Sequence, residues 1–235
     1  MKQLITAFSL MLAMATTAQT FAPAFNGFSK KKPTYITLKD GTELTVNLKS
    51  LKYKKGLIDD LKIIDENGEK VKINPEEISH MYVPPSNIAK FNQMVDAATD
   101  VTKIADNELS SEHLKDGYLY MESSNVQIKK KKTQYCMLQL MNPAFSKMVK
   151  VYNDPYAAES ASVGVGGMTV AGGLDKSYYI KIEGEDVAKR IKKKEYKKDM
   201  EEIFTKCPDV VNKYGADPSW SEFEQFIYEY TIKCQ

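Results

Sequence analysis

The sequence predicts an α+β protein in which a small N-terminal antiparallel β-barrel-like module and an amphipathic linker helix precede a larger antiparallel β domain with a C-terminal helical cap. Short runs rich in Val, Ile and Tyr alternate with turn pairs over residues 34–83 and 117–182, which is typical of antiparallel strands. Apolar residues recur at three- and four-residue steps over residues 88–105 and again near the C-terminus, which predicts helices.

Residues 1–18 have the pattern of a cleavable secretory signal. Lys2 precedes an apolar core at residues 4–15, and Ala18 ends a run of small residues suited to cleavage. We therefore expect export to the periplasm or the cell surface, with Gln19 as the new N-terminus; an uncleaved anchor is the alternative. No later run approaches the roughly 18 apolar residues of a transmembrane helix, so no transmembrane segment is expected after cleavage.

Residues 19–33 are predicted to be a linker, and residues 34–83 a small β module. Asp40-Gly41 and Asn67-Gly68 are pairs that favour tight hairpin turns between short alternating strands. Five short antiparallel strands must curl to cover their edges, which favours an SH3-like or Sm-like barrel.

Residues 84–116 are predicted to contain the linker helix and its connection. Pro84-Pro85 breaks the chain, Ser86 is placed to cap a helix, and the apolar stripe follows. We expect this stripe to pack on the neighbouring sheet. Binding to a membrane surface is the alternative, but Asp96 and Asp100 on the polar face are unlike a basic interfacial helix.

Residues 117–235 are predicted to form four to six antiparallel strands closed by helices. A helix is expected over residues 194–206, and another from Ser219, where Ser219 and Glu222 have the spacing of a capping box. Cys207 and Cys234 flank this helical part, so we expect them to form a disulfide. Cys136 lies within an apolar strand pattern and is expected to be a buried free thiol.

A glycine cluster at residues 164–173 is the most unusual stretch. A phosphate-binding loop is disfavoured, because Asp175 stands where that motif needs glycine and because a strand, not a helix, is expected to follow. A tight β-connection is the simplest interpretation. The alternative is a loop that faces a ligand or partner, with these candidate residues: Gly164, Gly166, Gly167, Gly172 and Gly173.

Catalytic and metal-binding patterns are sparse. His80 and His113 are the two histidines; without a third ligand nearby they predict no metal site, and no nucleophile elbow accompanies them. No cofactor and no catalytic residue is therefore assigned. The 33 basic and 31 acidic residues give no electrostatic case for nucleic acid. Lysine runs at residues 129–132 and 189–198 are expected to be solvated, with contact to an anionic lipopolysaccharide or acidic glycan as the alternative.

Several segments resemble uncharacterised exported proteins of Gram-negative bacteria of the Bacteroidota. They are residues 139–143, 150–155, 171–173 with 176–179, and the C-terminal segment from residue 203 to Cys234. The resemblance implies export and no particular activity. Together with the residue patterns it favours a non-enzymatic module that binds an envelope protein, glycan or lipid. A carrier of a small or lipid-like ligand in the central β domain and an unrecognised hydrolase are the alternatives.

Overall fold

The computed structural model describes residues 21–25, 27–54, 57–65, 67–86, 112–157, 164–165, 168–169, 174–215 and 217–234. The predicted signal peptide and the predicted helix of residues 88–105 lie outside the described residues. Within them, one sheet contains ten strands: β1 (Thr34–Leu38), β2 (Glu43–Lys54), β3 (Leu57–Ile64), β4 (Lys70–Ile73), β5 (Ile78–Val83), β6 (Leu119–Lys129), β7 (Lys132–Gln139), β8 (Val149–Asn153), β11 (Ser177–Ile182) and β12 (Val187–Lys192).

The α-helices of the described residues lie at the C-terminal end of the chain, as the sequence predicts for an α+β protein with a helical cap. Short 3-10 helices connect several strands, and three α-helices follow the last strand. They are η1 (Pro75–Glu77), η2 (Pro143–Phe145), η3 (Lys193–Glu195), α3 (Tyr196–Ile203), α4 (Pro208–Lys213), η4 (Trp220–Glu222) and α5 (Phe223–Lys233). None of the helices in the described part of the chain has the length and apolar character needed to cross a bilayer.

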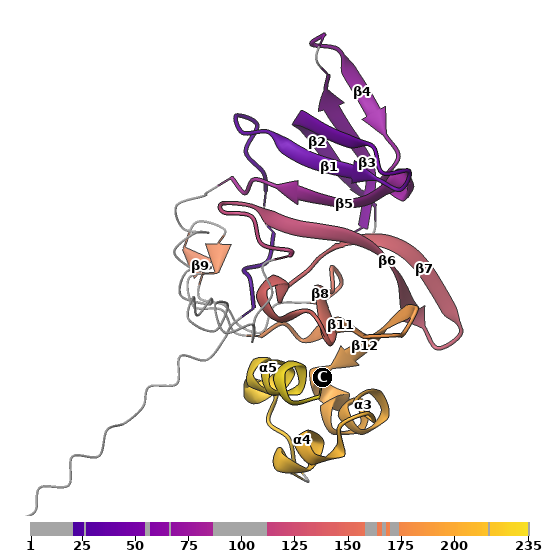
Figure 1. Ribbon diagram of the computed structural model, residues 1–235, viewed down its shortest axis with the longest axis vertical. Helices are drawn as coiled ribbons and strands as arrows, with labels where there is room; N and C mark the ends of the chain where they lie inside the picture. Colours follow the sequence, from indigo (N-terminus) through magenta and orange to yellow (C-terminus); the bar gives the residue numbers. More distant parts are fainter. Residues whose placement is uncertain are drawn as a thin grey trace, which may run out of the picture.

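The strands of residues 34–83 form because their turns are locally encoded. Gly41 adopts a φ of +88° between β1 and β2, where any other side chain would be strained, and Asp40 Oδ1 accepts a hydrogen bond from the backbone N–H of Thr42 at 2.9 Å. Asn74 caps η1 in the same way, accepting from the N–H of Glu76 at 3.0 Å. These strands occupy one end of the molecule, shown from indigo to magenta in Figure 1.

The two β parts share one continuous sheet. β5 pairs antiparallel with β6, with His80 opposite Glu122 and Tyr82 opposite Tyr120, so the order runs β4-β3-β2-β1-β5-β6-β12-β11-β8, with β7 paired to β6. The sheet is not closed, and its strand pairing therefore does not confirm an SH3-like or Sm-like barrel.

One pairing departs from the purely antiparallel sheet that the turn signals favour. β12 runs parallel to β6, with Ala188 opposite Val126, while β11 is antiparallel to both β12 and β8. The sheet bends back at this point, because an isolated bridge between Leu140 and Tyr152 sets the end of β7 beside β8. Side chains of β6 and β7 consequently face those of β8 and β11.

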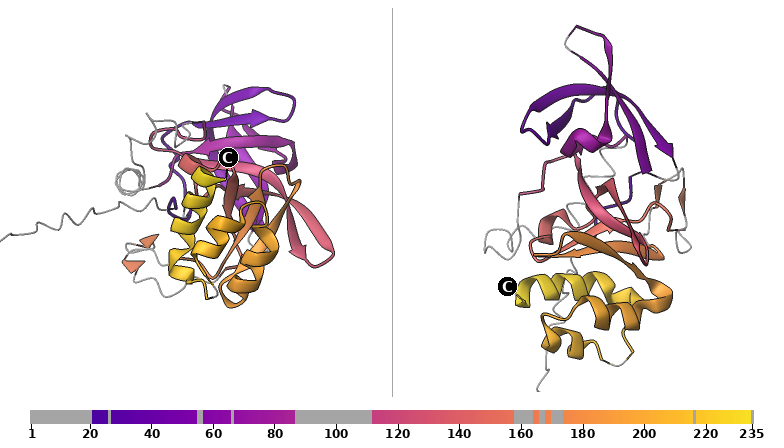
Figure 2. Two further views of the ribbon diagram at one scale, coloured as in Figure 1. Left: turned by 60° about the horizontal axis from the view of Figure 1, so that its bottom comes forward. Right: turned by 90° about the vertical axis from the view of Figure 1, so that its right-hand side faces the viewer.

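Three apolar cores lie along the long axis of the molecule. The first fills the strands of residues 34–83 and includes Leu61 and Met81; the second, with Leu138 and Tyr152, lies between β6–β7 and β8–β11. The largest lies between β8–β11–β12 and the C-terminal helices, which cover that side of the strands in Figure 2. It is rich in aromatic rings, among them Phe223, which stacks on Trp220 with centroids 4.8 Å apart.

The helical cap differs from the sequence prediction at its termini. A separate helix, α4, begins at Pro208 directly after Cys207, because proline is well suited to the first turn of a helix. The predicted capping box at Ser219 is wrong: Ser219 makes no side-chain cap bond, its Oγ lies 2.6 Å from Ser221 Oγ, and η4 precedes α5. An aromatic core residue, Trp220, occupies this turn instead.

The described part of the predicted linker is packed along the protein. Phe21 is buried among Phe145, Tyr178 and Phe223 in the largest core. Further on, the backbone N–H of Phe25 donates to Gln139 Oε1 at 2.8 Å. This segment therefore connects the helical end to the strands of residues 34–83.

Candidate functional site

The structure places some of the predicted site residues. Cys207 and Cys234 form the predicted disulfide, with Cα atoms 5.8 Å apart, and Cys136 is a buried free thiol as expected. Gly164 lies in β9 (Gly164–Val165), which pairs with β10 (Met168–Thr169). The other glycines of the candidate loop, Gly166, Gly167, Gly172 and Gly173, lie outside the described residues.

One pocket with a strongly basic lining lies beside Lys176 and Ser177, at the start of β11. This open pocket of about 800 Å³ is surrounded by five cationic side chains and one acidic one. Its lining consists of Tyr156, Ala157, Lys176, Ser177, Arg190, Lys192, Lys193, Lys194 and Glu195. We call this the basic pocket.

The register between β11 and β12 creates the basic pocket. Ser177 lies opposite Lys192, and just beyond this pair the backbone N–H of Lys193 donates to the carbonyl of Lys176 at 2.9 Å. Lysines that are far apart in the sequence are therefore neighbours. Within the described residues, the exposed Lys176, Lys193 and Lys194 form no ion pair, while Lys192 contacts Glu195 at 3.2 Å. Three ammonium groups without an ion-pair partner in the described part of the chain thus border one pocket.

A buried ion pair supports the floor of the basic pocket. Arg190 Nη2 lies 2.6 Å from Oδ2 of Asp154, whose side chain is fully buried. Ser177 Oγ donates to the same oxygen at 2.6 Å, and the backbone N–H of Tyr156 donates to Oδ1 at 3.0 Å. These contacts fix the chain that follows β8 and hold Tyr156 at the rim of the pocket, where its side chain is 44% exposed.

The segment between the glycine cluster and β11 is anchored separately. Trp220 Nε1 donates to the carbonyl of Asp175 at 3.0 Å, and Asn153 Nδ2 donates to Asp175 Oδ2 at 3.1 Å. The helical cap therefore holds the backbone just before Lys176 and Ser177. This support fixes the backbone position from which the Lys176 side chain reaches the basic pocket.

A second open pocket adjoins the basic pocket at Tyr156, which lines both. It has a volume of about 440 Å³ and lies among β3, η1 and β7. Its polar lining includes Asp59, Asn74, Glu76 and Gln134, beside the ring of Tyr135. We call this the polar pocket.

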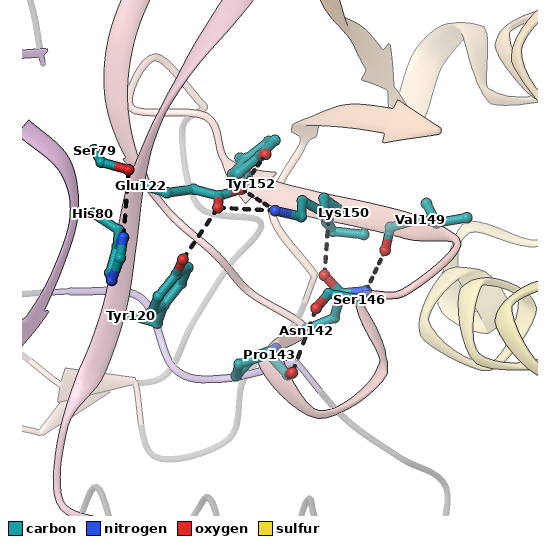
Figure 3. Close-up of polar contacts among 11 residues, drawn as sticks. Ser79, His80, Tyr120, Glu122, Asn142, Pro143, Ser146, Val149, Lys150 and Tyr152 are labelled. Atoms are coloured by element: carbon teal, nitrogen blue, oxygen red, sulfur yellow. Dashed lines mark hydrogen bonds and ion pairs between the residues drawn. The ribbon is translucent and has the colours of Figure 1, made fainter. Parts of the chain in front are cut away.

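A different cluster of titratable residues lies where β6 faces β8 (Figure 3). Glu122 accepts hydrogen bonds from Lys150 Nζ at 2.8 and 2.9 Å, from Tyr152 Oη at 2.5 Å and from Tyr120 Oη at 3.3 Å. Burial opposes ionisation of Glu122, but the charge of Lys150 and the hydrogen bonds from Lys150 and Tyr152 hold the pKa of this carboxyl below its usual range. Every acceptor direction of the carboxylate is thus in use.

Both histidines lie beside this cluster, although they are far apart in the sequence. The ring of Tyr120 stacks on His113 with centroids 4.4 Å apart and on His80 at 5.5 Å. Burial and the charge of Lys150 lower the pKa of His113, which favours its neutral form. In the described part of the chain, no group of three His, Cys, Asp or Glu side chains is arranged to hold a metal ion.

Comparison with known proteins gives no functional assignment for this chain. No protein family, curated protein or solved structure matches the chain. Sequence reasoning found the lysine run of residues 189–198 but missed the contribution of Lys176, which depends on strand register. It also missed the Glu122 cluster, for which no local signal exists.

Proposed function

We propose that the protein is an exported, non-enzymatic binding module that holds an anionic component of the cell envelope in the basic pocket. The observation that carries this proposal is the convergence of Lys176, Lys193 and Lys194, unpaired within the described residues, on one concave surface. Like charges that are held together repel one another, and an anionic ligand relieves that repulsion. Export follows from the predicted signal at residues 1–18, and the disulfide of Cys207 and Cys234 fits an oxidising compartment.

In this proposal the strands of residues 34–83 act as a barrel-like module of the SH3 or Sm kind. The five antiparallel strands that surround the core of Leu61 and Met81 support it. β5 joins this part to β6, so the module is attached to the binding surface through the sheet itself and contributes β3 and η1 to the polar pocket.

Binding to isolated envelope fractions tests the proposal. We expect the purified protein to sediment with envelopes at low salt and to be released as salt is raised, because screening weakens contacts of exposed charges. The triple substitution of Lys176, Lys193 and Lys194 by Ala should lower retention by about tenfold. Crosslinking in intact cells with a C-terminal tag should capture the same component.

A matched control separates the pocket from total charge. Lys129, Lys130 and Lys131 are exposed lysines at the β6–β7 hairpin, and their replacement by Ala removes the same charge. We expect nearly normal retention for this variant. Equal loss in both triple variants would contradict the proposal, and so would recovery of the protein from the cytoplasm in cell fractionation.

A second candidate function is the carriage of a small apolar ligand. A cavity of about 250 Å³ is lined by the apolar side chains of Ile58, Met121 and Met137 from β3, β6 and β7, and by polar residues that include Gln139, Asn153 and Asp154. A pocket of this kind holds a small molecule by burial of apolar surface. Displacement of an environment-sensitive apolar dye by candidate ligands tests it, with Met137→Asp expected to abolish dye binding. Unchanged dye binding by that variant would rule out this cavity.

A further inference from the structure

The basic pocket and the polar pocket are contiguous, and together they describe one ligand. Tyr156 lines both pockets and is 44% exposed, so a molecule that crosses from one to the other passes over its ring. Resting on the proposed function, we propose that the ligand is an acidic oligosaccharide whose anionic sugar lies in the basic pocket and whose neutral neighbouring sugar lies in the polar pocket.

The two pockets differ sharply in charge. Among its described lining residues, the basic pocket has five cationic side chains against one acidic side chain, that of Glu195. Among its described lining residues, the polar pocket carries Asp59 and Glu76 against one cationic residue, Lys54. A second anionic group would meet two carboxylates there, and this repulsion discriminates against a chain that is charged at every residue.

The polar pocket has the chemistry that sugar hydroxyls require. Carboxylates such as Asp59 and Glu76 accept hydrogen bonds from hydroxyl groups, while the side chains of Asn74 and Gln134 both donate and accept. Tyr135 and Tyr156 add aromatic surface, against which the apolar face of a sugar ring packs. An acyl chain finds no comparable match, because most of this lining is polar.

Specific contacts hold the two tyrosines that line the basic and polar pockets in place. Asp154 fixes the backbone of Tyr156 through Oδ1 and holds Arg190 through Oδ2. On the other side, Lys39 Nζ lies 4.0 Å above the ring centroid of Tyr135 and restrains that ring. Preorganised aromatic and charged groups lower the entropic cost of ordering a flexible oligosaccharide.

Binding measurements with defined probes test the inference. The probes are a hyaluronan tetrasaccharide, in which uronate and neutral sugars alternate, dextran sulfate, which is charged throughout, and phosphatidylglycerol vesicles. We expect Tyr156→Ala to weaken tetrasaccharide binding about tenfold and to change dextran sulfate binding less than about twofold. The double variant Lys193→Glu with Lys194→Glu should weaken binding of both polyanions.

Tyr53→Ala is the matched control, since Tyr53 is 51% exposed and lines the neighbouring cavity of about 250 Å³. We expect it to bind the tetrasaccharide normally. Tyr156→Ala could bind the tetrasaccharide as tightly as the wild type while the double lysine variant loses binding. That result would overturn the proposal of an acidic oligosaccharide but would still support anion binding in the basic pocket. Tighter binding to the phosphatidylglycerol vesicles than to the tetrasaccharide would overturn the oligosaccharide proposal in favour of a lipid headgroup. Failure of every anionic probe to bind would overturn the proposed function as well.

Discussion

Arg190 Nη2 of β12 lies 2.6 Å from Oδ2 of Asp154, the residue that follows β8, so the ion pair spans the intervening strand β11 beside the basic pocket. The Asp154 side chain is fully buried, whereas that of Arg190 keeps 29% of its surface exposed. Arg190 therefore neutralises a buried carboxylate while its remaining surface belongs to the ligand pocket. The pair couples the stability of the fold to the charge of the site.

Removal of Arg190 should consequently destabilise the protein as well as weaken anion binding. Arg190→Met leaves Asp154 buried without its counterion, and we expect a loss on the order of 3 kcal/mol in the free energy of unfolding. Urea denaturation measures it. Lys189→Met is the control, because Lys189 pairs with Glu185 at the surface and such pairs contribute less than about 1 kcal/mol. Similar losses in both variants would contradict this role of Asp154.

Acid should weaken the contact between Glu122 and Lys150. The pKa of Glu122 is lowered in the folded state, so its contribution to stability is present above the ordinary pKa of glutamate and is lost as the pH falls through the folded value. We expect Glu122→Gln to cost about 2 kcal/mol at pH 7 and progressively less below about pH 4.5. Urea denaturation of both proteins between pH 7 and pH 3 measures this difference.

Glu185→Gln is the matched substitution for that experiment, since it removes the same charge from a more exposed ion pair with Lys189. Its effect should stay small at every pH. A constant difference between Glu122→Gln and the wild type across the whole range would refute the assigned role of ionised Glu122.

Local signals account for what the sequence predicts well. Asp40-Gly41 and Asn67-Gly68 act within a few residues, since Gly68 adopts a φ of +82° and Asp65 Oδ1 accepts the N–H of Glu69 at 2.7 Å. The alternation of apolar residues then fixes which face of each strand is buried. The strand positions and the core residues of residues 34–83 both follow from such short-range rules.

Contacts between distant residues escape the same reasoning. Glu122 and Lys150 are 28 positions apart on strands that are not neighbours in the sheet, and they meet only because the sheet bends back. Asn142 shows a milder case: its turn is predictable, but its three buried hydrogen bonds to Phe145, Val149 and Val151 depend on the fold. The basic pocket is an intermediate case. The lysine run can be recognised in the sequence, but the pairing of β12 with β11, which adds Lys176, cannot.

Cysteine chemistry should distinguish the free thiol of Cys136 from the disulfide of Cys207 and Cys234. Burial raises the pKa of Cys136 to about 11, so on the order of one thiol in a thousand is ionised at pH 8. We expect no reaction of the native protein with a thiol reagent and one equivalent after unfolding. Reduction of the bond between Cys207 and Cys234 should lower stability by about 3.5 kcal/mol. Peptide mapping that found Cys136 in any disulfide would contradict both assignments.

Glu224 should make the stability of the protein depend on pH in the opposite direction to Glu122. Burial raises the pKa of its carboxyl to about 7, although the hydrogen bond from the backbone N–H of Phe21 at 3.2 Å favours the charged form. Because the folded state holds the proton more tightly, this contribution is complete below about pH 4.5 and is lost as the pH rises to about 7. Glu224→Gln imitates the protonated form and should be more stable than the wild type by up to about 3 kcal/mol at pH 8, but not at pH 4.5. Thermal or urea denaturation at the two pH values measures this, with the exposed Glu222→Gln as control. Equal stability of Glu224→Gln and the wild type at pH 8 would show that Glu224 is solvated, and that Phe21 does not seal this edge of the core.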